Sequence, residues 1–315
     1  FSSIRHCSAK NGGGIYCLEY SSPVLTGNTL IGNSAHSGGG MYCEEYSSPR
    51  LTNNVLHGNS AQFNGGGIYC VYFASPTLMN NTLTGNTAQY DGGGMYCAHF
   101  ASPTLINNTL TGNTANSGGG MYCIDHSSPV LANCIFWGNT ALSGPGISED
   151  YSGSVAVSYS DIQDSWPGTG NMNLDPRFVD PANGNFRLLP VSPCINAGNP
   201  DTTGLGLPAT DPDGNPRVYS CAIDMGAFEA QSNLIVGGPI TANTSWSSDT
   251  VRVFCDVDIA DTVTLSIDPG VVVLFMGHHT INVQGRLLAQ GAPGDSVRFT
   301  PADTTAGWGG IRFDN

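Results

Sequence analysis

One hexapeptide recurs through the first part of this sequence at nearly constant spacing. Three glycines, an isoleucine or methionine, a tyrosine and a cysteine occur together five times, ending at Cys17, Cys43, Cys70, Cys97 and Cys123. Successive cysteines are 26, 27, 27 and 26 residues apart. A period of this length holds a few short strands with turns between them, and each repeat needs neighbours to bury its apolar side. The repeats therefore predict a solenoid.

The residues within one period favour strands. In the repeat that begins at Gly65, the segments 68–72, 77–79 and 82–84 have strand length and composition, and Ser-Pro, Asn-Asn and Gly-Asn corners separate them. No helical periodicity runs between these corners. Three short parallel strands per coil predict an all-β, right-handed parallel β-helix with about 26–27 residues per coil, since parallel crossovers are overwhelmingly right-handed.

Stacked coils turn each repeat position into a column. Two leucine columns are expected to point into the core, where each side chain contributes roughly 1.5–3 kcal/mol by burial. The first is Leu25, Leu51, Leu78, Leu105 and Leu131, and the second is Leu30, Leu56, Leu83, Leu110 and Phe136. The isoleucine or methionine of each hexapeptide shares a face with the cysteine two residues later, so both are also expected inside.

The five hexapeptide cysteines suit two interpretations. Thiolates in a row attract soft metals, but a tetrahedral site needs ligands that converge, which a straight column does not provide. We therefore expect a buried thiol ladder with no metal and no cofactor. The spacing of adjacent coils lies within the range of disulfide geometry, so the redox state of the ladder stays open.

Two columns of asparagine mark corners of the coil. Asparagine tolerates positive φ, and stacked amides form hydrogen bonds from coil to coil, so both columns are expected to be structural ladders. One column contains Asn28, Asn54, Asn81 and Asn108, and the other contains Asn33, Asn59, Asn86, Asn113 and Asn139.

The hexapeptide tyrosines are the candidate ligand-binding residues. They alternate with the inward cysteines, so we expect Tyr16, Tyr42, Tyr69, Tyr96 and Tyr122 to face outward as a stacked row. Exposed aromatic rows suit sugar rings or a protein partner. The alternative is that the rings stack only to stiffen the sheet. A second aromatic row, at positions 20, 46, 73, 100 and 126, runs beside the first.

The repeats resemble right-handed parallel β-helix proteins with a pectate-lyase-like fold, and in particular polymorphic outer-membrane-protein repeats. Gly-Gly-x-Ile-Tyr and Asn-x-x-x-x-Asn carry this likeness over residues 1–147. Residues 173–180, 192–198, 213–217 and 223–229 resemble a choice-of-anchor module. These resemblances imply a secreted or surface-anchored bacterial protein. They also imply a choice between a binding protein and a polysaccharide lyase or glycoside hydrolase.

Three domains are predicted. Residues 1–165 form the β-helix, residues 166–231 form the closing module, and residues 232–315 read as opening coils of a second β-helix, because strand-like segments alternate with a Pro-Gly turn. Cys194 and Cys221 bracket part of the module and are candidates for a disulfide in an oxidising compartment. Both ends of the sequence lie within strand patterns, so we expect the chain to belong to a longer protein.

The net charge of the chain and the distribution of its acidic residues limit the classes of function that it can have. The net charge is −14, with 10 Lys and Arg against 24 Asp and Glu, which disfavours nucleic acid as a partner. No apolar run is long enough to cross a membrane. The acids near the repeated tyrosines are not gathered into the pairs that glycosidases use, and we name no catalytic residue. We therefore expect an extracellular, non-catalytic structural or adhesive protein that binds polysaccharide or a surface protein, with a polysaccharide-active enzyme as the alternative.

Overall fold

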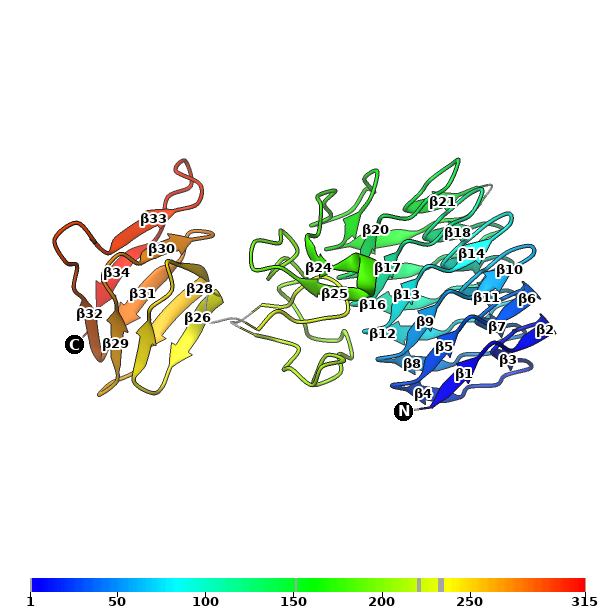
Figure 1. Ribbon diagram of the computed structural model, residues 1–315, viewed down its shortest axis with the longest axis horizontal. Helices are drawn as coiled ribbons and strands as arrows, with labels where there is room; N and C mark the ends of the chain where they lie inside the picture. Colours follow the sequence, from blue (N-terminus) through cyan, green and yellow to red (C-terminus); the bar gives the residue numbers. More distant parts are fainter. Residues whose placement is uncertain (1, 151, 220–221, 232–234, 315) are drawn as a thin grey trace. The chain divides into compact units, whose positions relative to one another are not determined.

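Two compact units make up the computed structural model, which describes residues 2–150, 152–219, 222–231 and 235–314 (Figure 1). The first unit comprises Phe1–Arg217 with Ile223–Glu229, and the second comprises Val218–Ala222 with Ala230–Asn315. Each unit has its own apolar core. No helix among the described residues has the length and apolar character needed to cross a membrane.

The first unit is a right-handed parallel β-helix built from four stacked sheets. Sheet A contains β1 (Ser3–Arg5), β5 (Thr29–Ile31), β9 (Val55–His57), β13 (Thr82–Thr84), β17 (Thr109–Thr111), β20 (Ile135–Trp137) and β23 (Asp161–Ile162). Sheet B contains β2 (Ser8–Asn11), β6 (Ser34–Ser37), β10 (Ser60–Ala61) and β14 (Thr87–Ala88).

The other two sheets complete each coil. Sheet C contains β3 (Ile15–Cys17), β7 (Met41–Cys43), β11 (Ile68–Cys70), β15 (Met95–Cys97), β18 (Met121–Cys123) and β21 (Ile147–Glu149). Sheet D contains β4 (Val24–Thr26), β8 (Arg50–Thr52), β12 (Thr77–Met79), β16 (Thr104–Ile106), β19 (Val130–Ala132) and β22 (Ala156–Ser158). Equivalent repeat positions pair directly, as Leu83 does with Leu56 and Leu110.

The expected fold is confirmed, but the expectation of three strands per coil is wrong. Sheet B lies where the sequence indicates only a corner after the second asparagine column. Its strands β10 and β14 are two residues long, too short to give a strand signal. Ala35, Ala61, Ala88 and Ala115 are buried on this side, and the last three form a small apolar cluster of their own.

The core contains the predicted inward columns. Both leucine columns are buried from the second coil onward, as are Met41, Ile68, Met95 and Met121. In the first coil, Ile15 and Leu25 are only partly buried and pack against the cluster. Fully buried side chains therefore run through the centre of the solenoid as continuous apolar rows.

The cysteine thiols of this unit differ sharply in exposure, which predicts their reactivity. Cys7 is exposed, whereas the free thiols of Cys17, Cys43, Cys70, Cys97, Cys123, Cys134 and Cys194 are buried. Burial raises the pKa of Cys134 to about 12, and a thiol rather than a thiolate reacts poorly. In the native protein we expect a thiol reagent to label Cys7 within minutes and the seven buried cysteines only after denaturation, as read by peptide mass spectrometry. Rapid native labelling of Cys70 would contradict the buried ladder.

The segment that follows the last coil packs into the same compact unit as the β-helix. It contains an antiparallel hairpin made of β24 (Phe178–Asp180), the 3-10 helix η1 (Pro181–Asn183) and β25 (Asn185–Leu188). The predicted boundary at residues 165 and 166 thus separates two parts of one unit. We call residues 166–217 and 223–229 the side module.

The predicted disulfide between Cys194 and Cys221 is not supported by the structure. Cys194 is a free, buried thiol whose Sγ donates to Oδ2 of Asp161 at 3.3 Å. A carboxylate acceptor inside the first unit, rather than a second sulfur, satisfies it. Cys221 lies outside the described residues. In the second unit, Cys255 is disulfide-bonded.

The second unit is also built from parallel strands. A six-stranded sheet contains β26 (Ile235–Ile240), β28 (Thr250–Ile259), β30 (Val272–Phe275), β31 (Thr280–Val283), β33 (Arg298–Pro301) and β34 (Gly310–Phe313). A three-stranded sheet contains β27 (Thr244–Trp246), β29 (Thr264–Ile267) and β32 (Arg286–Ala289). Val251 pairs with Val273, which pairs with Phe299, so coils stack here too. This confirms the start of a second β-helix.

Candidate functional site

The tyrosine column is stacked, but most of it is not the exposed row that the sequence predicts. Adjacent ring centroids lie 4.8–5.7 Å apart; the rings from Tyr42 to Tyr122 stack, whereas Tyr16 meets Tyr42 edge to face. Tyr42 and Tyr122 are only 8% exposed, and Tyr16 in the first coil is the exposed member, at 46%. Val71, Ala98 and their neighbours pack against the rings from one side. This geometry favours the interpretation that the tyrosines stiffen sheet C.

The glycines of the hexapeptide explain the burial of the tyrosines. Gly65 has a φ of 66° and turns the chain back over the column, and a Cβ atom there would lie 2.8 Å from the Cβ of Tyr69. The glycine turn thus lies close to the base of the tyrosine side chain, and Val71, Ala98 and Ile124 pack with the tyrosines. Burial raises the pKa of Tyr69 to about 12. At Tyr16, burial and then the hydrogen bond to Glu44 raise the pKa to about 12.

The second aromatic row is more exposed. Its members are Tyr20, Tyr46, Phe73, Phe100 and His126, all at positive φ between 58° and 64°. The rings stack with centroids 4.9–5.2 Å apart and interplanar angles of 3–13°. Rings stacked this closely along the column turn their faces toward one another and their edges toward solvent. The row therefore presents few ring faces to a sugar, which would pack against a face.

The two predicted asparagine columns form hydrogen-bonded ladders. Asn86 shows the pattern: its Oδ1 accepts from the backbone N and from Nδ2 of Asn59, each at 3.0 Å. Its Nδ2 donates to the carbonyl of Leu56 and to Oδ1 of Asn113. The third glycine of each hexapeptide leaves room for this amide, since a Cβ on Gly67 would lie 3.3 Å from it. All of these asparagines except the partly buried Asn28 are buried, and they serve the scaffold.

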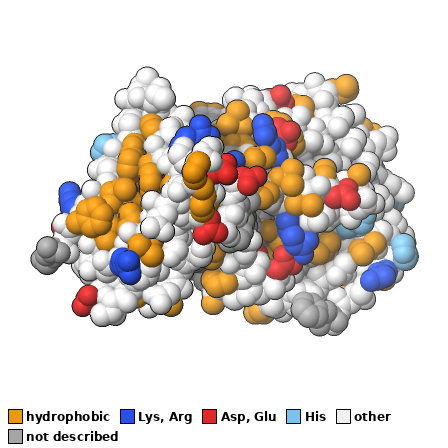
Figure 2. Space-filling model, turned by 60° about the vertical axis from the view of Figure 1, so that its left-hand side comes forward, with side chains coloured by type: hydrophobic (Ala, Val, Ile, Leu, Met, Phe, Trp, Pro, Cys, Tyr) orange, Lys and Arg blue, Asp and Glu red, His pale blue; other side chains and the backbone are white. Residues whose placement is uncertain are grey.

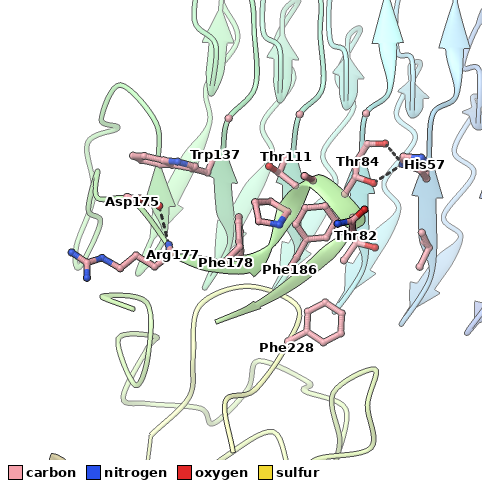
Figure 3. A pocket seen from close by; sticks show the side chains of 18 of the residues that line it. His57, Thr82, Thr84, Thr111, Trp137, Asp175, Arg177, Phe178, Phe186 and Phe228 are labelled. Atoms are coloured by element: carbon pink, nitrogen blue, oxygen red, sulfur yellow. Dashed lines mark hydrogen bonds between the residues drawn. The ribbon is translucent and has the colours of Figure 1, made fainter. Parts of the chain in front are cut away.

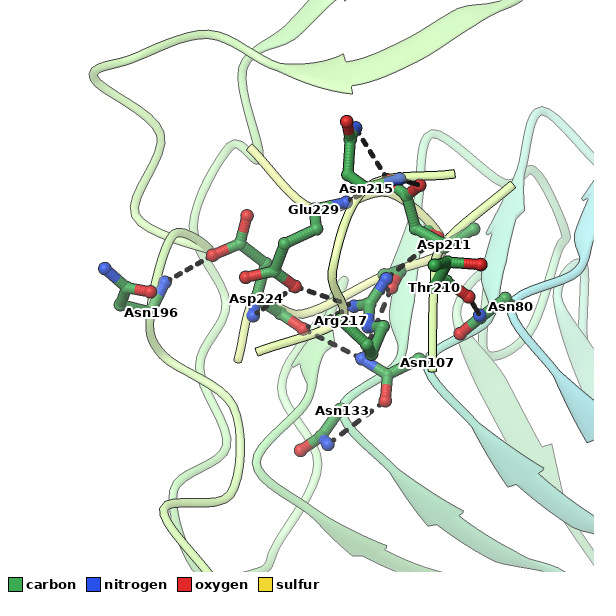
Figure 4. Close-up of polar contacts among 12 residues, drawn as sticks. Asn80, Asn107, Asn133, Asn196, Thr210, Asp211, Asn215, Arg217, Asp224 and Glu229 are labelled. Atoms are coloured by element: carbon green, nitrogen blue, oxygen red, sulfur yellow. Dashed lines mark hydrogen bonds and ion pairs between the residues drawn. The ribbon is translucent and has the colours of Figure 1, made fainter. Parts of the chain in front are cut away.

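A third asparagine column, which the sequence analysis did not single out, holds the side module. Asn80, Asn107 and Asn133 occupy a corner of the coil at φ values of 53–54°. Nδ2 of Asn80 donates to the carbonyl of Thr210, and Nδ2 of Asn107 donates to that of Asp224 (Figure 4). The Asn-Asn pairs at positions 80–81 and 107–108 were the available signal, because Asn81 and Asn108 complete a ladder whereas Asn80 and Asn107 do not belong to it.

A buried arginine organises the part of the side module that packs on this corner (Figure 4). Arg217 is 2% exposed and donates to the carbonyls of Asp224, Gly226 and Ala227. Its guanidinium lies 3.5 Å from the carboxylate of Glu229. Burial, and then Asp224, raise the pKa of Glu229 well above its usual range.

The Asp-x-Asp-Gly-Asn segment nearby is a hydrogen-bonded turn. Oδ1 of Asp211 accepts from the backbone N atoms of Asp213 and Asn215, each at 2.9 Å, and Oδ2 accepts from the N of Glu229. Both carboxylate oxygens are thereby occupied. Among the described residues, no group of His, Cys, Asp and Glu is arranged to hold a metal ion.

A cleft of about 1150 Å³ lies between the outer face of sheet A and the β24–β25 hairpin (Figure 3). Strands β9, β13, β17 and β20 form its floor, and Phe178 and Phe186 of the hairpin form one wall. Phe228 of the side module adds a third ring, with the guanidinium of Arg187 lying 4.8 Å above it. The sequence did not predict this cleft, because it joins residues 55–138 of the coils with residues 175–228 of the side module.

One outward row of sheet A lines the floor. His57, Thr84, Thr111 and Trp137 pair in register on four neighbouring strands. At the usual strand spacing, the row is about 14 Å long. Nδ1 of His57 contacts the hydroxyl and the carbonyl of Thr84, whereas the hydroxyl of Thr111 has no protein partner among the described residues. Thr84 and Thr111 are only 5% and 8% exposed, so the partly exposed indole of Trp137 and the hydroxyl of Thr111 are what this row offers a ligand.

The cleft is poor in charge. Among the described residues that line it, Asp175 carries the one carboxylate and Arg177 the one guanidinium. Oδ1 of Asp175 accepts from the backbone N of Arg177 at 2.9 Å. The guanidinium of Arg177 extends away from the threonines and phenylalanines (Figure 3). On the molecular face drawn in Figure 2, charged side chains are scattered and form no basic patch.

Two of the remaining acids near the end of the β-helix have hydrogen-bond partners within the fold, and the buried Asp161 lies near enough to Asp175 to feel its charge. Asp161 is fully buried, with Oδ1 accepting from the backbone N of Leu174. Asp180 accepts from the side chain of Asn183. Glycosidases need two carboxylates facing one bond. The structure instead gives these acids structural partners.

The titration of Asp161 predicts a pH dependence of stability. Burial raises the pKa of Asp161 from 3.8 to about 6, so the folded state favours the protonated form. The free energy of unfolding linked to protonation of Asp161 is fully present below pH 4. It falls by about 3 kcal/mol at most as the pH rises through 6. Between pH 4 and pH 8, we expect the free energy of unfolding of the wild type to fall by this amount relative to that of Asp161→Asn, which has no titrating group at this position. Parallel denaturation profiles would refute the assignment.

Comparison with known proteins agrees with the fold. A family model described as right handed beta helix region matches residues 2–110, which covers the coils up to β17. No curated protein and no solved structure matched the chain. The match and the stacked parallel sheets together establish a β-helix repeat protein.

Proposed function

We propose that this chain is part of a non-catalytic, extracellular β-helical protein of structural or adhesive type that binds a glycan. The cleft on sheet A is the observation that carries the proposal. Three phenylalanines, Trp137 and a row of threonines surround about 1150 Å³, slightly more than the roughly 300–1,000 Å³ typical of ligand sites. Apolar rings with a few placed hydroxyl groups are the surface that suits sugar rings.

The aromatic and asparagine columns support the structural part of this proposal. Each coil repeats the same inward leucines, amide ladder and stacked tyrosines, so the solenoid is stiffened along its length. Repetition of this kind makes a stalk rather than a catalytic centre, because a catalytic site requires residues that differ from coil to coil. The cleft is such a non-repeated feature, since the side module occurs once.

The residues of the cleft favour binding over hydrolysis. A glycosidase needs a second carboxylate within about 5–10 Å of the first. A lyase needs a basic side chain aimed at the sugar ring, and Arg177 points elsewhere. The polysaccharide-active alternative thus gains no support from the described lining residues.

An extracellular or cell-surface location in a bacterium is part of the proposal. The disulfide at Cys255 suits an oxidising compartment, since such bonds are rare in the cytosol. The resemblance of residues 173–229 to a choice-of-anchor module points in the same direction. Nucleic acid is an unsuitable partner for a chain of charge −14.

Replacing Trp137 with alanine tests the binding role of the cleft. A buried aromatic anchor commonly contributes 2 kcal/mol or more to binding, so we expect the dissociation constant to rise at least about ten-fold. Native gels cast with a panel of neutral and acidic polysaccharides identify the ligand, and titration calorimetry with its oligosaccharide gives the affinity.

The matched control for this experiment is Tyr20→Ala, which removes a 72% exposed ring from the second aromatic row. We expect this variant to bind as the wild type does. Melting curves establish that Trp137→Ala remains folded. Loss of binding in Tyr20→Ala with normal binding in Trp137→Ala would move the site to the corner row, and clearing of polymer in the gel would replace binding with catalysis.

A further inference from the structure

We propose that the cleft is specific for a neutral saccharide, which lies across the coils along the row from His57 to Trp137 and excludes uronic acid chains. This inference rests on the proposed function and names the ligand class of the same site. It follows from how the ligand must be recognised, from the charges that face it and from the field of the whole chain.

Recognition in this cleft has to use side chains. Strands β13 and β17 pair with a neighbour on both edges, so their backbone groups are already used within sheet A. An extended peptide therefore finds no open edge of these strands to extend as an added strand. Hydroxyl groups of the threonine row and aromatic faces remain, and these complement the hydroxyl groups and apolar ring faces of a sugar.

The row sets the direction of the ligand. Thr84 and Thr111 are direct register partners, and Thr111 pairs with Trp137, so equivalent contacts recur at each strand along the β-helix axis. The strand spacing of about 4.8 Å is comparable to the length of one pyranose unit. A chain that follows the row places one ring on the indole of Trp137 and the next units over the two threonines.

Charge decides which saccharide is accepted. A carboxylate on the bound chain would lose water beside Phe186, Phe228 and Trp137, and a desolvated charge needs a paired cation. The guanidinium of Arg177 is directed away from these rings (Figure 3), and that of Arg187, 4.8 Å from the ring of Phe228, is already paired with Asp213. Asp175 lies at the Trp137 end of the cleft, where its carboxylate would repel a carboxylate on the bound saccharide. The uncharged hydroxymethyl group of a neutral sugar avoids both the desolvation of a charge and the repulsion by Asp175.

The field of the whole chain acts in the same direction. A net charge of −14 disfavours the approach of a polyanion, an effect that weakens as salt screens it. Acidic chains are thus excluded by a local effect, the lack of a cation in the cleft, and by a long-range effect, the repulsion from the net negative charge. High salt would remove the second effect and leave the first.

Matched pairs of ligands test the inference. β-1,4-glucan, β-1,4-mannan and β-1,3-glucan hexamers are each compared with the counterpart oxidised to the uronate at C6, by titration calorimetry with the whole chain at low and high salt. We expect at least one neutral hexamer to bind and its uronate to bind at least ten-fold more weakly at both salt concentrations. Equal or tighter binding of the uronate overturns the inference but keeps the glycan site. Binding of neither member of any pair overturns the proposed function as well.

Two variants locate the discrimination in the cleft. Thr111→Val preserves the shape of the side chain and removes its hydroxyl group, so we expect a three- to ten-fold loss of affinity for the neutral hexamer with an unchanged melt. Val55→Arg places a guanidinium on the outward face of β9, where Val55 is 38% exposed. We expect it to raise the affinity for the uronate about two- to five-fold, with Val55→Thr as the matched control. The proposed placement is contradicted if Val55→Arg binds the uronate with unchanged affinity. It is also contradicted if Thr111→Val binds the neutral hexamer as tightly as the wild type does.

Discussion

Replacing Asn86 with alanine is expected to lower the free energy of unfolding of the first unit by roughly 3–5 kcal/mol, because four buried hydrogen bonds of about 1 kcal/mol each disappear. The amide of Asn86 links Asn59, Leu56 and Asn113 within one ladder. Alanine leaves the backbone N of Asn59 without its acceptor inside the core, and an orphaned buried donor adds to the cost.

Hydrogen exchange read by mass spectrometry is the suitable measurement, since it separates the two units of the chain. We expect faster exchange in peptides from coils three and four of Asn86→Ala. The control is Asn116→Ala, which truncates an exposed asparagine in the fourth coil and is expected to change stability by less than about 0.5 kcal/mol. Equal exchange in the two variants would mean that the ladder contributes little to the solenoid.

Replacing Arg217 with methionine is expected to cost about 3–5 kcal/mol. Methionine fills similar space, but three carbonyl groups lose their donor and Glu229 loses its cation within a buried region. The side module should then separate from the asparagine corner while the coils remain folded. Limited proteolysis of residues 196–229 gives a direct measurement of this separation.

Two further variants isolate the buried arginine. Arg187→Met removes the exposed pair with Asp213 and is expected to cost at most about 1 kcal/mol, as exposed ion pairs usually do. Adding Glu229→Gln to Arg217→Met removes the unpaired acid, so part of the lost stability should return at neutral pH. Equal costs for the two arginine variants would contradict the structural role of Arg217.

The repeat made the solenoid predictable from the sequence. Identical residues at 26–27-residue spacing must occupy equivalent places, so the inward leucines and the asparagine corners follow from strand alternation alone. Equivalent positions of successive repeats pair in register, so a periodic sequence reveals which distant residues are neighbours, and a sequence without repeats does not. The hidden sheet B shows the limit, since a two-residue strand such as Thr87–Ala88 leaves no alternation to detect.

The candidate site was not predictable in the same way. Strand alternation indicates that the tyrosines leave the core, but it does not reveal that Tyr42 is buried in a second apolar cluster with Val71 and Ala98. The cleft depends on a hairpin at residues 178–188 crossing strands at residues 55–137. Nothing in the local pattern of either segment encodes that contact, which is fixed by Asn80, Asn107 and Arg217 elsewhere.

The location of a bound saccharide tests the central claim most directly. A crystal structure of the chain with the hexamer that binds in calorimetry should show a sugar ring on the indole of Trp137 and the chain running toward Thr84, under the β24–β25 hairpin. A saccharide found instead along the edges of the corner row at Tyr46 and Phe73 would contradict the assignment of the cleft.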